Sequence, residues 1–280
     1  MSFSVNTNAG ALFALQALNK TNRQLDTVQS RINTGLKVAS ARDNAAVFAI
    51  AQGQRGELAG LSAVKSSLDQ ASSSLNVALA ATEAVSELLI QLKEKATAAS
   101  DPSASSETLS ALNDEFQNLI AQIDTVVNNA EFNGVNAVKT GGKDITALTG
   151  VPDGTLSIGN FSITIGKTDI SAKASGLALT SAALTSAGTA SAALAKITVA
   201  ETKLKTFLST LGAGAKRVDI QRAFTDKLSD AIEIGIGNLV DADLARESAN
   251  LQSLQVRQQL GLQALSIANQ APGSVLSLFR

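Results

Sequence analysis

The sequence at residues 11–39 is ALFALQALNKTNRQLDTVQSRINTGLKVA. Apolar residues recur at every seventh position, and a neighbouring, partly polar line repeats at the same interval. The first line consists of Ala11, Leu18, Leu25, Ile32 and Ala39, and the second of Leu15, Asn22, Gln29 and Leu36. A seven-residue apolar repeat is typical of a helix that packs in a coiled coil. The stretch therefore predicts a helix that needs a partner helix.

The opposite end of the chain repeats the pattern at Leu244, Leu251 and Leu265, and Pro272 predicts where that helix stops. Neither end carries enough apolar surface to stabilise a helix alone, because most helical stability comes from tertiary packing. We expect both ends to complete their fold only on meeting further copies of the chain. The residues expected to carry this self-assembly are Leu12, Leu15, Leu18, Leu25, Ile32, Leu244, Leu251, Leu254 and Leu265.

Composition excludes several classes of function. The 280 residues include no His, Cys, Trp or Tyr, so imidazole bases, thiol nucleophiles, His or Cys metal ligands and disulfides are excluded. Acidic and basic residues are interspersed at a net charge of -1, which argues against a nucleic-acid partner. Neither a long apolar run nor a secretory signal is visible, so we expect no membrane span.

The middle of the chain is mostly helical in pattern. Residues 42–99 predict one long amphipathic helix, and Asp101 and Pro102 break it. Residues 105–129 predict a second helix, packed antiparallel to the first because the connection is short. From Ser191 the helical pattern resumes, with a pause expected around Gly212 and Gly214, and continues to about residue 271.

Residues 132–170 change to an alternating apolar pattern with frequent glycines. Residues 156–158 and 161–165 predict a β-hairpin closed by Gly159 and Asn160. Residues 171–190 are rich in Ser, Ala and Thr and predict a weakly structured return segment. The predicted fold class is mainly α, a long antiparallel helical rod with terminal coiled-coil helices and a small β-hairpin insertion.

Two stretches resemble catalytic or ligand sites. Gly166, Lys167 and Thr168 imitate the end of a phosphate-binding loop, but the preceding glycine is too distant and a β-turn is favoured. A helically spaced acidic group could hold a cation, although nearby basic residues favour a solvated, salt-bridged face. This group is Asp219, Asp226, Asp230 and Glu233. We therefore predict no catalytic, cofactor or metal site, and no enzyme.

Residues 3–52, FSVNTNAGALFALQALNKTNRQLDTVQSRINTGLKVASARDNAAVFAIAQ, closely resemble the N-terminal region of bacterial flagellins. Residues 239–280, LVDADLARESANLQSLQVRQQLGLQALSIANQAPGSVLSLFR, resemble their C-terminal region, and AEFNGV at 130–135 resembles their junction between helix and hairpin. The short middle resembles alphaproteobacterial flagellins with a short variable region.

The resemblance implies a structural subunit that polymerises by heterologous helical contacts into the flagellar filament, the propeller for swimming. It implies an inner coiled-coil domain with spoke at 1–41 and 240–280, and a helical shell at 42–130 and 190–239. Residues 131–189 would form a β-hairpin and surface-exposed variable region. The spoke, here the joint between inner and shell helices, matches Arg31, Asn33, Gly35, Lys37, Arg42, Asp43 and Asn44. A hook-filament junction protein and a type III secretion needle or translocator remain alternatives.

The same resemblance implies partners and a location. Flagellins leave the cell through a type III export apparatus with an export chaperone, meet hook-associated and cap proteins, and become part of the extracellular flagellum. By the same analogy, O-glycosylation is possible in this segment, and an undecorated linker is an equally good interpretation of its composition. The candidate residues are Thr180, Ser181, Thr185, Ser186 and Thr189. Flagellins that the vertebrate innate receptor detects carry arginine, glutamate and leucine where this chain has Gln91, Glu94 and Lys95. We expect weak receptor activation.

Overall fold

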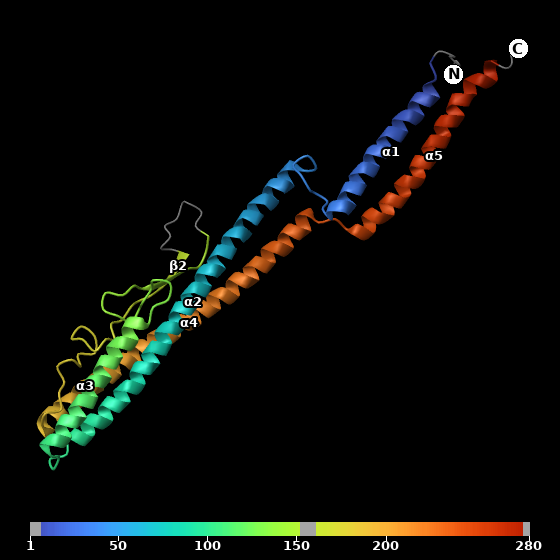
Figure 1. The fold of residues 1–280 in the computed structure, drawn as a ribbon. Coiled ribbons are helices and arrows are strands. Elements are labelled where there is room, and N and C mark those ends of the chain that lie inside the picture. The colour runs from blue at the N-terminus through green and yellow to red at the C-terminus, as the bar shows by residue number, and fades with distance from the viewer. Residues whose placement is uncertain (1–6, 152–160, 277–280) are drawn as a thin grey trace. The chain divides into compact units, whose positions relative to one another are not determined.

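The computed structural model describes residues 7–151 and 161–276, with side chains up to residue 270. Within that part of the chain, five helices and one small sheet follow in sequence order (Figure 1). They are α1 (Ala9–Thr34), α2 (Ala45–Ala99), α3 (Ser106–Asn129), β1 (Ile145–Leu148), β2 (Ser162–Ile165), α4 (Ala187–Val240) and α5 (Leu244–Leu276). The prediction of a mainly α fold with a small β insertion is confirmed.

The chain forms two compact units. The terminal unit comprises Met1–Gly56 and Ala231–Arg280, and the central unit comprises Glu57–Asp230. Both α2 and α4 run from one unit into the other, since their bounds cross these limits.

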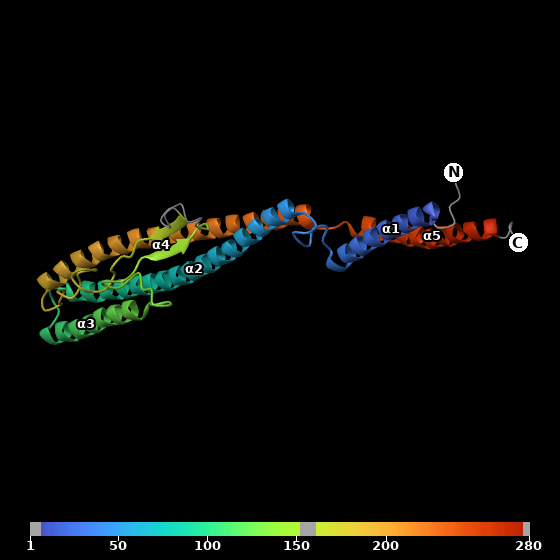
Figure 2. The same ribbon diagram turned by 90° about the horizontal axis from the view of Figure 1, so that it is seen from above.

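In the central unit, α3 lies alongside α2 and α4 (Figures 1 and 2). The three helices share one apolar core, in which Phe116 of α3 is fully buried. The short connection predicted after α2 is present, and the Ser105 hydroxyl accepts a hydrogen bond from the Thr108 N–H to begin α3. This side chain satisfies one of the N–H groups that a helix start leaves unpaired.

The sheet covers part of this core. Strand β1 pairs antiparallel with β2, with Ile145 opposite Ile165 and Ala147 opposite Ile163. All four of these side chains are buried, as expected for a strand pair with one face on a core. The predicted strand 161–165 is thus confirmed as β2, whereas residues 156–160 of the predicted hairpin lie outside the described residues.

The return segment is not weakly structured, and that prediction was wrong. Leu177, Leu179 and Leu184 are fully or almost fully buried in the core of the central unit. The Asp124 carboxylate accepts a hydrogen bond from the Ala172 N–H, and the Asn113 side chain accepts one from the Leu184 N–H. Long-range packing and side chains of α3 therefore order residues 171–186, which have no regular secondary structure, and residues 187–190 begin α4.

The expected course of the last helical stretch was also wrong. Helix α4 runs unbroken through Gly212 and Gly214, and the chain breaks later, between Val240 and Leu244. A Cβ at Gly214 would lie 2.7 Å from Cδ1 of Ile165, so this glycine allows β2 to approach the helix. Helix α5 continues past Pro272 to Leu276, so the proline does not mark its end.

By length and composition alone, α2 would pass as a membrane-crossing helix. Core helices pass the same test, and Leu68, Leu75 and Leu89 of α2 are fully buried in the central unit. Packing against α3 and α4 accounts for this apolar character.

Candidate assembly interface

Helices α1 and α5 of the terminal unit pack side by side (Figures 1 and 2). Leu25 and Val28 of α1 meet Leu254 of α5 in a small buried cluster, with Ile32 and Leu251 packed at its edge. Leu18 is also buried. The Asn8 side chain donates to the Ala268 carbonyl at 2.6 Å, and the Gln258 amide donates to the Asn22 side chain at 2.9 Å. The coiled-coil pattern predicted for the two ends thus pairs them with each other.

The second line of α1 differs from its prediction. Val28 is buried, whereas Gln29 and Leu15 are exposed. Val28, the residue before Gln29, packs against Leu254 of α5 in its place. Only Asn22 of the predicted line meets α5 through a side-chain hydrogen bond.

Gly261 marks a close approach of α5 to α1. A Cβ at this position would lie 3.3 Å from Cδ1 of Leu18, tighter than ordinary van der Waals contact. A larger side chain here would push the two helices apart. The glycine is therefore a small-residue contact inside a continuous helix.

An ion pair joins the two helices at one end of the pair. Arg31 Nη1 lies 3.1 Å from Glu247 Oε1, and the side-chain exposures are 33% and 11%. Leu244, Glu247 and Leu251 are spaced by three and four residues, so this acid occupies the contact line of α5. Sequence reasoning missed Glu247, although that spacing could have identified it.

We expect Arg31→Ala to destabilise the α1–α5 pair by about 1–2 kcal/mol, because it leaves the Glu247 carboxylate buried without its counter-charge. The partial exposure of Arg31 keeps the loss below that of a fully buried pair. Hydrogen exchange of the α1 and α5 amides in the full chain should become roughly 5–30 times faster. Adding Glu247→Gln should recover part of the protection, and no acceleration in Arg31→Ala would contradict the role of the ion pair.

The segment predicted to be the spoke is bonded to the α4–α5 junction. Gly35 ends α1 with φ 71°, a left-handed conformation that favours glycine. The Lys37 N–H donates to the Val240 carbonyl at 2.7 Å, and the Ala242 N–H donates to the Gly35 carbonyl at 2.9 Å. A second apolar cluster in the same unit consists of the buried residues Val38, Ala51, Ile236 and Val240.

Asp43 holds the rest of the spoke in a turn. Its Oδ2 accepts hydrogen bonds from the backbone N–H groups of Ser40 and Ala39 and from the Ser40 hydroxyl. These bonds, led by that from the Ser40 backbone, hold the pKa of the Asp43 carboxyl below its usual value. The Asn44 side chain accepts from the Val47 N–H at the start of α2. Asn33, Lys37 and Arg42 present exposed side chains instead.

Large apolar side chains remain exposed on the terminal unit. They occur on α1, on α5 and on the parts of α2 and α4 that belong to this unit. They are Leu12, Phe13, Leu15, Ile50, Ile234, Leu244, Val256, Leu260, Leu262 and Ile267. Where exposed apolar residues gather on one face, they indicate an interaction surface.

Helix α5 carries two apolar faces. Leu251, Leu254 and Leu265 face α1 or its edge, whereas Val256, Leu260 and Ile267 are 55%, 57% and 70% exposed. At about 100° per residue the second set falls on the side of α5 opposite Glu247 and Leu254. A helix that is apolar on both sides is normally buried on both sides.

The self-assembly residues predicted from sequence therefore divide into two groups. Leu18, Leu25 and Leu254 are buried within the helix pair, and Ile32, Leu251 and Leu265 are half-buried. Leu12, Leu15 and Leu244 are exposed.

The positions compared with receptor-recognised flagellins lie on α2. Gln91 and Glu94 are exposed, and Lys95 Nζ lies 2.6 Å from the Glu115 carboxylate of α3. This hydrogen bond raises the pKa of Lys95.

The five candidate glycosylation residues are all exposed. The Ser181 hydroxyl accepts a hydrogen bond from Lys196 Nζ, and Ser186 and Thr189 bond each other at the start of α4.

The two stretches that resembled ligand sites are engaged in structural contacts. Lys167 Nζ donates to the Gly142 carbonyl at 2.7 Å, which ties the segment to the β insertion. Asp226 pairs with Lys65 at 2.8 Å, and Asp69 pairs with Arg222 at 3.0 Å, so the acidic face of α4 is linked to α2. Among the described residues, acidic side chains form no cluster of three that could hold a metal ion.

Comparisons with known proteins place the chain in one family. The model of the bacterial flagellin N-terminal helical region matches residues 5–139, and that of the C-terminal helical region matches residues 194–279. The chain is 46% identical to flagellin FljK of Caulobacter vibrioides over 277 residues, covering 99% of this chain and 98% of that protein. It is 37% identical to a flagellin of Brucella melitensis, covering 99% of each.

A crystal structure of Bacillus cereus flagellin matches with a TM-score of 0.47 at 23% identity, covering 56% of this chain and 86% of that one. The two family models together with the nearly full-length relatives decide the assignment. The chain belongs to the bacterial flagellins, the family of structural subunits that form the flagellar filament.

Proposed function

We propose that this chain builds the filament by packing the α1–α5 pair of each copy against the α1–α5 pairs of its neighbours. The observation that carries this proposal is the second apolar face of α5, formed by Val256, Leu260 and Ile267 and left exposed in the single chain. Burying an exposed leucine or isoleucine is worth about 1.5–3 kcal/mol, so three of them supply a strong drive to associate.

In this proposal the outer face of α5 packs against a different surface of the next copy, so the contact is heterologous. A heterologous contact repeated without ring closure gives a helical polymer. In this proposal residues 1–41 and 240–280 form the inner coiled coil, residues 42–130 and 190–239 the shell, and residues 131–189 the outer surface. The work of the subunit is mechanical and not enzymatic.

The proposal extends to partners and location. The chain would leave the cell through the type III export apparatus after release from a chaperone, and assemble beneath a cap onto hook-associated proteins. The filament is then extracellular. The absence of Cys suits passage of an unfolded chain, and the exposed hydroxyls between Thr180 and Thr189 would be open to O-glycosylation. The nearly full-length flagellin relatives favour a filament subunit over a junction protein or a needle subunit.

Hydrogen exchange before and after seeded assembly tests the proposal. We expect amides of α1 and α5 to exchange far more slowly in filaments than in the free chain, while amides of α3 change little. The contrast arises because α3 already packs in the core of its own subunit. Equal protection of α1 and α5 in the two states would contradict the proposed interface.

We expect the monomer to activate the vertebrate innate receptor weakly. Compared with flagellins that the receptor detects, Gln91 replaces the guanidinium group of an arginine, which can donate several hydrogen bonds. Lys95 places a charged group where those flagellins have an apolar leucine that the receptor would bury. Reporter cells should respond at least roughly tenfold more strongly to the variant Gln91→Arg with Lys95→Leu, since each restored anchor is worth about 1–2 kcal/mol. The change Lys139→Arg serves as a control, and full-strength activation by the unchanged monomer would overturn the expectation.

A further inference from the structure

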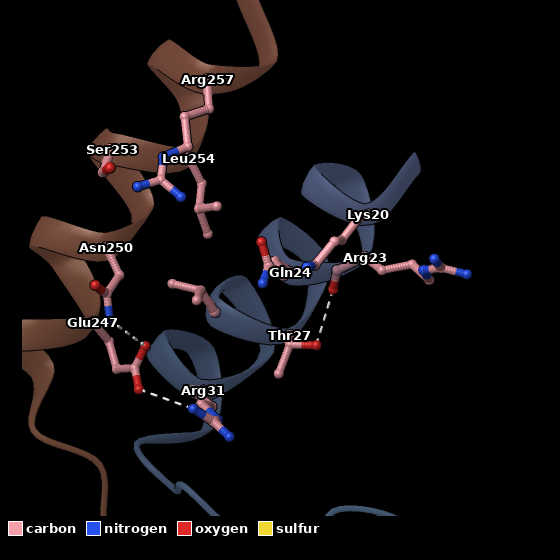
Figure 3. Close-up of a pocket in the computed structure, with 11 residues that line it drawn as sticks. Lys20, Arg23, Gln24, Thr27, Arg31, Glu247, Asn250, Ser253, Leu254 and Arg257 are labelled. Carbon is pink, nitrogen blue, oxygen red and sulfur yellow. Dashed lines mark hydrogen bonds and ion pairs between the residues drawn. The ribbon is translucent and has the colours of Figure 1, made fainter. Parts of the chain in front are cut away.

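The α1–α5 pair contains a groove of about 520 Å³ that is rich in basic side chains (Figure 3). Its basic lining residues are Lys20, Arg23, Arg31 and Arg257, and its acidic lining residue is Glu247. Arg31 is paired with Glu247. Figure 3 shows Lys20 on α1 and Arg257 on α5 flanking the groove, whereas Arg23 points away from α5. The charge of the groove is therefore not balanced by its own acid.

A second hollow, of about 490 Å³, lies at the α4–α5 junction in the same terminal unit. Its charged lining residues are Glu233, Asp241 and Asp243, and all three are exposed. Asp243 Oδ1 accepts a hydrogen bond from the Arg246 N–H, but no described basic side chain lines this hollow. We call this surface the acidic junction.

We propose that the basic groove of one copy receives the acidic junction of the next copy. The two surfaces match in charge, since Lys20 and Arg257 flank the groove beside the Arg31–Glu247 pair and three acids line the junction. They are different patches of one unit, so the contact is heterologous and can repeat along a polymer. This inference rests on the proposed function and adds to it, because apolar faces give affinity whereas paired charges fix the register between subunits.

Paired charge reversals in the full-length chain test the contact. The groove variant carries Lys20→Glu and Arg257→Glu, and the junction variant carries Glu233→Lys and Asp241→Lys. A control variant, Lys143→Glu with Lys173→Glu, makes the same charge change as the groove variant, at exposed residues of the central unit. Each protein is added to wild-type seeds, and filament length is measured by electron microscopy, with circular dichroism to verify folding.

We expect each reversed variant alone to elongate at least roughly tenfold more slowly than wild type, because like charges then face each other. An equimolar mixture of the two should elongate from seeds of that mixture, since the reversed groove then meets the reversed junction. The control should elongate normally. Normal elongation by both single variants, or no recovery in the mixture, would overturn the inference. Arrest at a closed dimer would overturn it too, and failure of wild type to elongate would instead contradict the proposed function.

Discussion

The triple change Val256→Ser, Leu260→Ser and Ile267→Ser should abolish seeded filament growth while leaving the helical content of the free chain nearly unchanged. These side chains are more than half exposed in the single subunit, so the free chain loses little packing. Each serine removes about 1–2 kcal/mol of apolar burial from the assembled state. The sum of roughly 3–6 kcal/mol raises the concentration needed for growth at least about 100-fold. Sedimentation of seeded samples over a range of concentrations measures this.

A matched control keeps the surface apolar through Val256→Ile, Leu260→Met and Ile267→Val. Such substitutions preserve most of the buried area and should leave growth within about threefold of wild type. Growth of the serine variant at wild-type concentrations would show that the outer face of α5 is not a subunit contact.

The second large effect is expected in the central unit. Phe116→Ala should lower the free energy of unfolding of that unit by about 3–5 kcal/mol, because the ring is fully buried in the core and its removal leaves a cavity. Urea unfolding of the free chain, followed by helix content, measures the loss.

Asn118→Ala on the exposed side of the same helix provides the comparison. This change should alter the free energy of unfolding by no more than about 0.5 kcal/mol, since the side chain is exposed. A loss below about 1 kcal/mol for Phe116→Ala would contradict the described core.

The sequence predicted the helices well because their signals are local. Ser105 as a cap and the turn residues Asp101 and Pro102 place the boundary between α2 and α3 within a few residues. The seven-residue repeat of α1 likewise identified Leu18 and Leu25 as contact residues.

The errors arose where long-range packing decides the structure. Glycines 212 and 214 suggested a break, but Gly214 is small because Ile165 of β2 lies against it. Residues 171–190 are rich in Ser, Ala and Thr, and this composition gave no sign that Leu177, Leu179 and Leu184 would be buried in the core beside α3. The ion pair of Glu247 could not be predicted from local sequence, because its partner Arg31 is 216 residues away.

The candidate interface could be predicted only in part. Periodicity shows which α1 and α5 residues share a face, but which residues meet the other helix depends on the register. On the second line of α1 the prediction was wrong at Gln29, since Val28 is buried against α5 instead. The outer face of α5 could be identified only from the structure, in which Leu254 packs against α1 and Val256, Leu260 and Ile267 stay exposed.

The most direct test is electron microscopy of purified full-length protein beside a chain that lacks residues 1–40 and 240–280, both seeded with short filament fragments. We expect only the full-length protein to elongate into long uniform tubes, because the shortened chain keeps its central unit but has no α1–α5 pair. Equal elongation by the shortened chain, or a full-length chain that remains monomeric, would contradict assembly through the terminal helices.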